Sequence, residues 1–179
     1  ASTVEGLASR FLGKPAPPFR MTTLDRKTID SKSLAGKIVV LHFWSYKGDM
    51  LVEPYGQVGY LDFLHGKRHR LGVEVIGVAV NPALGNPQQS RAAQRSIRKL
   101  REFMNLGYPI ATDTGKLIES FGDPRQLDAK LPLWVVIDAG GKVAGYKAGF
   151  YQIKADEGLR QLDELVIRLI REKRKKSSK

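Results

Sequence analysis

Few side chains in this sequence could do acid–base or metal chemistry. The chain contains three histidines, His42, His65 and His69, and no cysteine. It therefore has no thiol nucleophile, no disulfide, no thiolate metal ligand and no iron–sulfur cluster. His65 and His69 have a spacing that could chelate a metal on a helix, but residues 65–70 are cationic and supply no carboxylate. His42 lies in an apolar run and is expected in the core, so we predict no metal site and no cofactor.

Other catalytic arrangements are equally hard to find. Asp49 could act as a general base, but no partner nucleophile accompanies it, and a carboxylate at a helix start or loop explains it as well. Ser45 belongs to no Ser/His/Asp arrangement, and the sequence has no Gly-x-x-x-x-Gly-Lys-Ser/Thr phosphate loop. We therefore predict no catalytic residue.

Positive charge is the clearest remaining signal. The chain has 30 Lys and Arg against 18 Asp and Glu, a formal net charge of +12, which predicts salt-dependent attraction to anionic partners. Further bases lie in residues 67–70 and 171–179. One predicted helix concentrates five bases, of which the first three share a face: Arg91, Arg95, Arg98, Lys99 and Arg101.

Two interpretations of these bases stay open. They could contact an acidic protein, nucleic acid or anionic lipid, or they could form a solvated helix face and a solubilising tail. Aromatic residues do not alternate with the bases, and no nucleic-acid-binding module is recognisable. Nucleic acid and a membrane surface are therefore partners without a supporting motif.

The elements that would position these residues follow from hydrophobic patterning. Continuous apolar, β-branched runs predict strands covered on both faces at 38–44, 73–80 and 133–138. The last strand turns at 139–141 into a β-hairpin with residues 142–148, and a small hairpin is expected within 21–33. Periodicity near 3.6 predicts helices at 53–70, 90–106 and 156–171, the last with Asp156 as N-cap.

This order predicts an α/β fold with a central mixed sheet, helices on both faces, and a C-terminal β-hairpin followed by a helix. The length of 179 residues suits one domain, and no apolar run is long enough for a transmembrane helix. We divide the chain into an N-terminal extension at 1–12, a domain at 13–170, and a basic tail at 171–179. The tail is expected to be frayed or disordered.

Five segments occur together in a characteristic order: 13–19 (GKPAPPF), 24–29 (LDRKTI), 34–44 (LAGKIVVLHFW), 72–80 (GVEVIGVAV) and 131–142 (LPLWVVIDAGGK). Together they resemble the thioredoxin-like redoxins, which include the TlpA/ResA type of thiol–disulfide oxidoreductase and the related AhpC/TSA peroxiredoxins. The resemblance covers about 13–170 and implies a thioredoxin-like fold.

The same resemblance exposes a departure from the family. In its reducing members a Cys-x-x-Cys motif follows the tryptophan that matches Trp44, and the next helix N-terminus lowers the pKa of the first thiol. Here residues 44–51 read WSYKGDML, so Gly48 and Leu51 take the two cysteine positions. Neither side chain can be a nucleophile, and peroxiredoxins also need a cysteine in this loop. The resemblance implies the fold and not the activity, and we predict that the chain is not an enzyme.

A second family feature is present. Pro132 matches the proline that is cis in thioredoxin folds and faces the active-site loop. In active members the backbone before this proline pairs with an extended substrate peptide, so Leu131 offers an edge for β-augmentation. The alternative is that Pro132 serves only the fold. The predicted binding face comprises Trp44, Tyr46, Asp49, Met50, Leu131 and Pro132.

These observations predict a non-catalytic thioredoxin-like module that binds another protein or acts as a structural or accessory subunit. Gly48-Asp49-Met50-Leu51 replaces the redox motif, and the partner is another protein, acidic or part of a larger assembly. Two alternatives stay open: a redoxin-type enzyme that relies on a partner's thiols, and an anion-binding accessory protein. Relatives of the TlpA type usually work outside the bacterial cytoplasm, so the resemblance favours an exported, periplasmic location.

Overall fold

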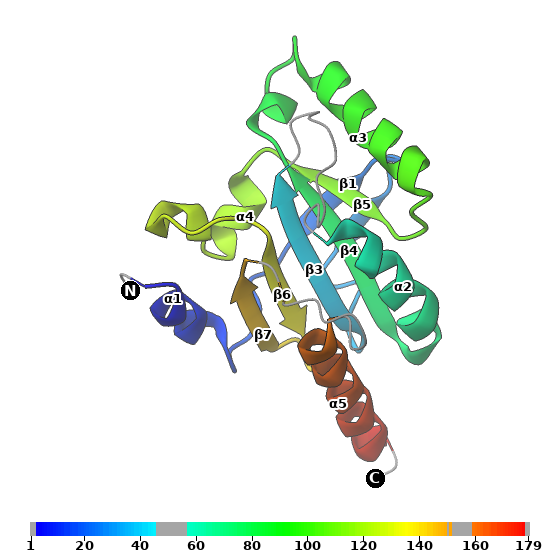
Figure 1. Cartoon of the computed structure of the whole chain (residues 1–179). Coiled ribbons are helices and arrows are strands. Elements are labelled where there is room, and N and C mark those ends of the chain that lie inside the picture. The colour runs from blue at the N-terminus through cyan, green and yellow to red at the C-terminus, as the bar shows by residue number, and fades with distance from the viewer. Residues whose placement is uncertain (1–2, 46–56, 150, 152–158, 178–179) are drawn as a thin grey trace.

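The protein is built on one seven-stranded mixed sheet with the strand order β2-β1-β5-β4-β3-β6-β7 (Figure 1). The computed structural model describes residues 3–45, 57–149, 151 and 159–177. The strands are β1 (Arg20–Thr23), β2 (Thr28–Asp30), β3 (Ile38–Ser45), β4 (Val73–Val80), β5 (Ile110–Asp113), β6 (Leu133–Ile137) and β7 (Val143–Ala148).

β3 is the central strand. Its residues from Ile38 to Trp44 are all buried, as their continuous apolar pattern predicts for a strand covered on both faces. It pairs parallel with β4 and antiparallel with β6. β6 continues into β7 through a tight turn in which the Asp138 carboxylate accepts the amides of Gly140 and Lys142, both at 2.9 Å. The predicted mixed sheet and its hairpin are confirmed.

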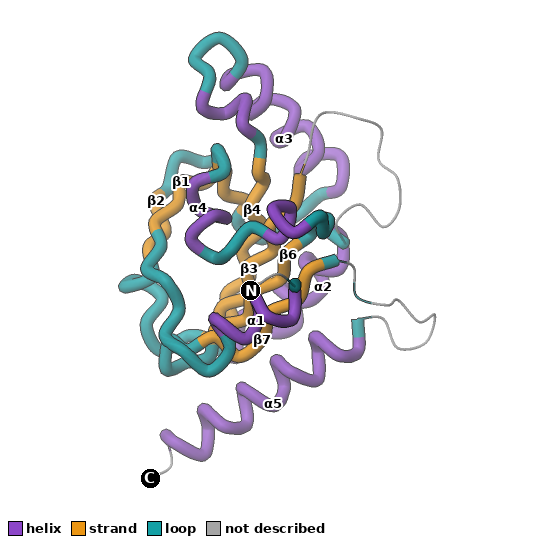
Figure 2. Tube along the Cα trace, turned by 90° about the vertical axis from the view of Figure 1, so that its left-hand side faces the viewer, coloured by secondary structure: helices purple, strands orange, loops and turns teal. Residues whose placement is uncertain are grey.

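Helices cover both faces of this sheet, as predicted (Figure 2). They are α1 (Val4–Phe11), α2 (Val58–Arg68), α3 (Ser90–Met104), α4 (Lys116–Ser120) and α5 (Arg160–Ser177), with short 3-10 helices η1 (His69–Leu71), η2 (Pro82–Gly85) and η3 (Pro124–Leu127). α2, α3 and α5 pack with Trp44 and Trp134, whereas α4 packs with Phe43 on the other face, where Phe11 of α1 also packs. Among the described residues, no helix is both long and apolar enough to span a membrane.

The C-terminal helix differs from its sequence-based prediction. α5 runs from Arg160 to Ser177, so the expectation of a frayed or disordered tail from residue 171 is wrong for the residues up to 177. Leu169 and Ile170 anchor the helix in the core. The lysines and arginines beyond them are good helix formers and interact favourably with the C-terminal end of the helix dipole. Asp156, the expected N-cap, lies outside the described residues.

Three elements escaped the sequence analysis: α1, β5 and α4. α1 begins at Thr3, whose hydroxyl accepts the Gly6 amide at 3.0 Å, and its Phe11 ring stacks on Tyr146 with 5.3 Å between centroids. α1 therefore packs on β7 within the fold. The division of the chain into segments at residues 12 and 170 stays a prediction. α2 is shorter than expected and ends where η1 begins.

The packing of α3 generates a stability prediction. Ile97 is 1% exposed and Phe103 is 80% exposed on the same helix. Ile97→Ala should lower the free energy of unfolding by about 2–5 kcal/mol because it leaves a core cavity. Phe103→Ala should change it by only about 0.5 kcal/mol. Urea denaturation followed by circular dichroism measures both variants, and equal effects would contradict this orientation of α3.

Candidate functional site

The candidate site centres on the turn formed by Leu131 and Pro132, which we call the cis-proline turn. The peptide bond between these residues is cis, as expected. Pro132 is buried, and its carbonyl accepts the Gly149 amide at 2.7 Å. Leu131 is half-buried, and none of the other described residues forms a hydrogen bond with its backbone. The turn therefore presents the amide and carbonyl of Leu131, to which no other described residue is hydrogen-bonded, beside the anchored carbonyl of Pro132.

The strand register brings the cis-proline turn next to the end of β3. Phe43 of β3 lies opposite Leu133 of β6, so Trp44 and Ser45 follow on the side of the turn. The remaining residues of the predicted site are Tyr46, Gly48, Asp49, Met50 and Leu51. They lie outside the described residues, so their position at this turn stays a prediction.

Trp44 lies beneath the predicted binding face. It is only 2% exposed and packs on the side of the sheet covered by α2, α3 and α5. Gly77 of β4 leaves room for the neighbouring Tyr108 ring, because a Cβ at that position would lie 2.9 Å from Tyr108 Cε2, whereas its 3.6 Å distance from Trp44 Nε1 would be an ordinary contact. The indole ring is therefore a support for the site and is not an exposed contact.

Gln57 is a site residue that the sequence analysis missed. Its side-chain Nε2 donates to the Tyr151 carbonyl at 2.8 Å, and its Oε1 accepts the Tyr151 amide at 3.1 Å. Gln57 is buried and has a left-handed backbone, with φ of 62°. This two-bond clamp joins the start of α2 to the chain that follows β7. The two residues are 94 positions apart, and no local pattern marks either of them.

Two buried tyrosines complete the support of this region. Tyr108 donates its hydroxyl to the Val58 carbonyl at 2.9 Å, and burial, with a smaller effect of Asp62, raises the pKa of Tyr108. Tyr151 packs edge-on against Trp134 with 5.4 Å between centroids, and burial raises its pKa to about 12. Both phenols are therefore neutral at physiological pH and act through packing and hydrogen bonding.

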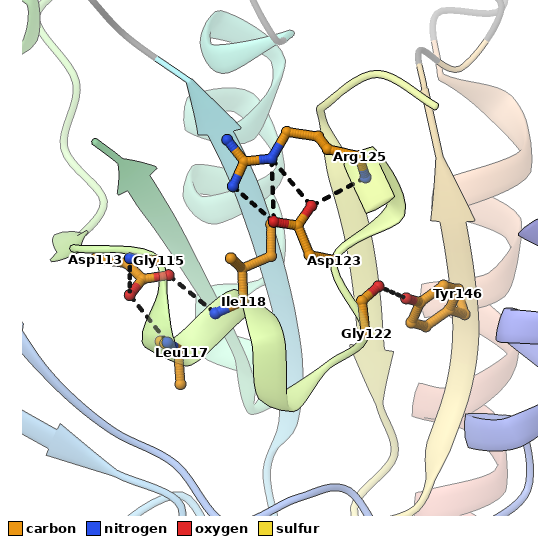
Figure 3. Close-up of polar contacts among 8 residues, drawn as sticks. All are labelled: Asp113, Gly115, Leu117, Ile118, Gly122, Asp123, Arg125 and Tyr146. Carbon is orange, nitrogen blue, oxygen red and sulfur yellow. Dashed lines mark hydrogen bonds and ion pairs between the residues drawn. The ribbon is translucent and has the colours of Figure 1, made fainter. Parts of the chain in front are cut away.

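Two aspartates fix the chain that leads to the cis-proline turn (Figure 3). The Asp113 carboxylate accepts the amides of Gly115, Leu117 and Ile118 at 2.9–3.0 Å, which satisfies free amides at the start of α4. Asp123 caps η3 through the Arg125 amide and forms an ion pair with the Arg125 guanidinium, the shortest N–O distance being 2.7 Å. Charge-assisted hydrogen bonds of this kind are among the stronger ones in proteins.

Tyr146 holds the same connection from the side of β7. Its hydroxyl lies 2.6 Å from the Phe121 carbonyl and 2.7 Å from the Gly122 carbonyl. Gly122 has a φ of 76° and lies against Leu7 and Phe11 of α1, where a Cβ would be 2.7 Å from Leu7 Cδ1. The segment between α4 and β6 is thus held between α1 and β7.

The five bases predicted to face an anionic partner separate into two groups in the structure. Arg98 donates to the Leu24 carbonyl at 2.8 Å, and Arg101 binds both carboxylate oxygens of Asp25 at 3.1 Å. These two side chains tie α3 to the connection between β1 and β2. The three exposed bases are Arg91, Arg95 and Lys99. The anionic contact stays a prediction, now centred on those three.

The histidines have no catalytic arrangement among the described residues. His42 is fully buried, with its ring centroid 4.2 Å from that of Trp134, so its core position is confirmed. His65 and His69 lie ring against ring at 4.9 Å. Within the described ranges, no group of three or more histidine and acidic side chains could hold a metal ion.

The sheet order, the cis-proline turn and the helices on both faces define a thioredoxin-like protein. A solved thiol:disulfide interchange protein from Chlorobium tepidum TLS superimposes with a TM-score of 0.64 at 24% identity, covering 88% of this chain and 96% of that one. The exposed lipoprotein thioredoxin of Streptococcus pneumoniae strain TIGR4 superimposes with a TM-score of 0.60 at 20% identity, covering 87% and 99%. At these identities the likeness establishes the fold.

The chain belongs to the AhpC/TSA family, whose model matches residues 12–146. It is also 30% identical over 154 residues to the thiol-disulfide oxidoreductase ResA of Bacillus thuringiensis subsp. konkukian, covering 86% of this chain and 75% of the relative. The resemblance found in the sequence is thereby confirmed. The departure is equally plain, because this chain contains no cysteine.

Asp123 generates a pH-dependent prediction. Burial raises its pKa, but the hydrogen bonds and charge of Arg125 outweigh burial and leave the pKa below its ordinary value. The carboxylate therefore stabilises the fold above the unfolded pKa of about 3.9, and this contribution is lost as pH falls through the folded value. Asp123→Asn should cost about 1–3 kcal/mol at pH 7 and reduce the loss of stability in acid. Denaturation from pH 7 to pH 3 tests this, and parallel curves for both proteins would contradict it.

Proposed function

We propose that this protein is a non-catalytic thioredoxin-like module that binds another protein at the cis-proline turn. The single observation that carries the proposal is the combination of a preserved turn with the complete absence of thiols. The Leu131 peptide unit has no partner among the described residues, whereas the chain has no cysteine to form a mixed disulfide. Peptide capture is therefore possible here without redox chemistry.

The chemistry of the turn suits an extended peptide segment. An unoccupied amide and carbonyl next to the end of a sheet can pair with a strand from a partner by β-augmentation. The Gln57–Tyr151 clamp and the two aspartates hold the surrounding backbone, which lowers the entropic cost of binding. A preorganised backbone edge of this kind supports binding and supplies no acid, base or nucleophile.

We place the protein outside the bacterial cytoplasm. One solved structure with the same fold, at 21% identity and a TM-score of 0.58, is titled a secreted disulfide oxidoreductase of Mycobacterium tuberculosis. Another is titled an exposed lipoprotein thioredoxin. The location of these two proteins supports the proposal for this one, and fractionation of the native cells tests it.

One test of the proposed function concerns catalysis. The purified chain should show no disulfide-reductase or peroxidase turnover above a boiled control, because Gly48 and Leu51 stand where the family's thiols are. Gly48→Cys combined with Leu51→Cys is the matched variant, and it should acquire reductase activity because a thiolate can then attack a disulfide. Turnover by the unmodified chain would contradict the non-catalytic role. Turnover that appears only with a thiol-bearing partner would favour an enzyme that borrows its thiols.

Another test of the proposed function concerns binding at the cis-proline turn. Leu131→Asp should weaken partner retention by about tenfold or more, since it places an unpaired charge at an apolar contact. Leu12→Asp is the matched control, because Leu12 is 42% exposed and bridges to Val143 at the start of β7, whereas the cis-proline turn lies near Ala148 at the end of that strand. Co-purification from the native source, washed at low and then high salt, measures retention. Thermal denaturation verifies that Leu131→Asp is folded.

A second candidate function rests on α3. Its exposed bases Arg91, Arg95 and Lys99 follow one another at intervals of four residues, and Phe103, 80% exposed, continues the row. This row suits an acidic partner with an apolar contact. In the same experiment, a partner lost at moderate salt and by Arg91→Glu with Arg95→Glu, but retained by Leu131→Asp, would favour α3 over the cis-proline turn.

A further inference from the structure

A cavity of about 600 Å³ lies between η1 and the C-terminal end of α5. It is lined by Arg70, Leu71, Gly72, Ile170, Lys173, Arg174 and Ser177. Three of these seven residues are cationic, and none is acidic. We call this cavity the cationic pocket, and its two sides come from segments about a hundred positions apart in the sequence.

The pocket lies at the opposite end of the molecule from the cis-proline turn. Gly72 immediately precedes β4, and its carbonyl accepts the amide of Ile38, the first residue of β3, at 3.0 Å. The pocket is therefore at the amino ends of these parallel strands, whereas the cis-proline turn is at the carboxyl end of β3. Figure 1 shows the arrow of β3 pointing away from the C-terminal end of α5.

The backbone at Gly72 makes room for one of the cations. A Cβ built on Gly72 would lie 2.7 Å from Lys173 Nζ, so the ammonium group occupies the space that a side chain would need. Gly72 has a φ of 81°, which also favours glycine. Lys173 is half-buried and extends from α5 across to η1. One positive charge of the pocket therefore lies directly beside the backbone of Gly72.

The three cations of the pocket are not neutralised within the described part of the chain. Neighbouring bases do have acidic partners: Arg68 pairs with Asp163 at 3.1 Å, and Arg168 lies 3.8 Å from Glu172. No described carboxylate forms an ion pair with Arg70, Lys173 or Arg174. Holding like charges together without a counter-ion is unfavourable, and a bound anion relieves this repulsion.

We propose that the cationic pocket binds a phosphate group. Arginine and lysine together give both forked and point-charge donors for phosphate oxygens. The Ser177 hydroxyl, also on the lining, donates to the Lys173 carbonyl at 3.1 Å. Leu71 and the buried Ile170 form an apolar part of the lining, which suits a phosphate joined to a less polar group. A soluble phosphate compound and the headgroup of an anionic phospholipid share this chemistry. The inference does not rest on the proposed function, because the two sites lie at opposite ends.

The test uses the full chain and two probes. Inorganic pyrophosphate, measured by calorimetry, represents soluble phosphate. Phosphatidylcholine vesicles with and without phosphatidylglycerol, measured by sedimentation, represent a lipid surface. The key variant combines Arg70→Gln, Lys173→Gln and Arg174→Gln, which removes the charge while keeping good helix formers. It should weaken binding by about tenfold or more, because charge-assisted hydrogen bonds are lost.

The matched control combines Lys27→Gln, Lys32→Gln and Lys116→Gln. These three lysines are exposed, and the control removes the same charge from elsewhere on the surface. The control should bind both probes within about twofold of the unmodified chain, as expected for weakly coupled surface charges. Circular dichroism establishes that both triple variants keep their helices.

Each outcome decides between the pocket and a general charge effect. Loss of pyrophosphate binding in the pocket variant alone supports the proposal with a soluble phosphate ligand. Loss of binding to phosphatidylglycerol vesicles in that variant alone, with no binding of pyrophosphate, supports it with a lipid headgroup. Equal losses in both variants, or no binding of either probe by the unmodified chain, would overturn it.

Discussion

The rest of the structure depends on the burial of β3 from Ile38 to Trp44. From Ile38 to Trp44 no residue of this strand reaches solvent, so its peptide groups need partners in β4 and β6 and its side chains need cover on both faces. Each apolar side chain so buried contributes about 1.5–3 kcal/mol. This requirement places α2, α3 and α5 on one side, and α4 with the N-terminal segment on the other.

The position of β3 also explains how the chain keeps a thioredoxin-like fold without the cysteines of its relatives. In this chain the end of β3 lies beside the cis-proline turn because of strand register, and none of the contacts that hold the turn uses sulfur. Pro132 is tied to Gly149, Gln57 to Tyr151, and Asp123 to Arg125. The contacts that hold this backbone edge are therefore independent of the thiols that the chain lacks.

The tertiary structure also decides where the positive charges of the chain lie. A net charge of +12 identifies a protein attracted to anions but does not locate the contact. Folding uses Arg98, Arg101 and Arg125 in intramolecular contacts. It leaves exposed bases on α3 and gathers others between η1 and the end of α5. The three surfaces that we propose for contacts, which are the cis-proline turn, the exposed row on α3 and the cationic pocket, are therefore made by different elements.

The sequence by itself determined the fold class, the central strands, α3 and the absence of thiol chemistry, because burial pattern, periodicity and composition are local properties. It did not predict β5 or α4, which are too short to show a period, nor the helical continuation of α5 beyond Arg171. For the site it named Leu131, Pro132 and Trp44, and although it placed Trp44 in a covered strand, the tertiary structure was needed to show that the indole ring is no exposed contact. The Gln57–Tyr151 clamp joins residues 94 positions apart. Contacts between residues so far apart in the sequence form only when the chain folds, so no local pattern reveals them. For the same reason only the tertiary structure decided which lysines and arginines are used in intramolecular contacts and which stay available to a partner.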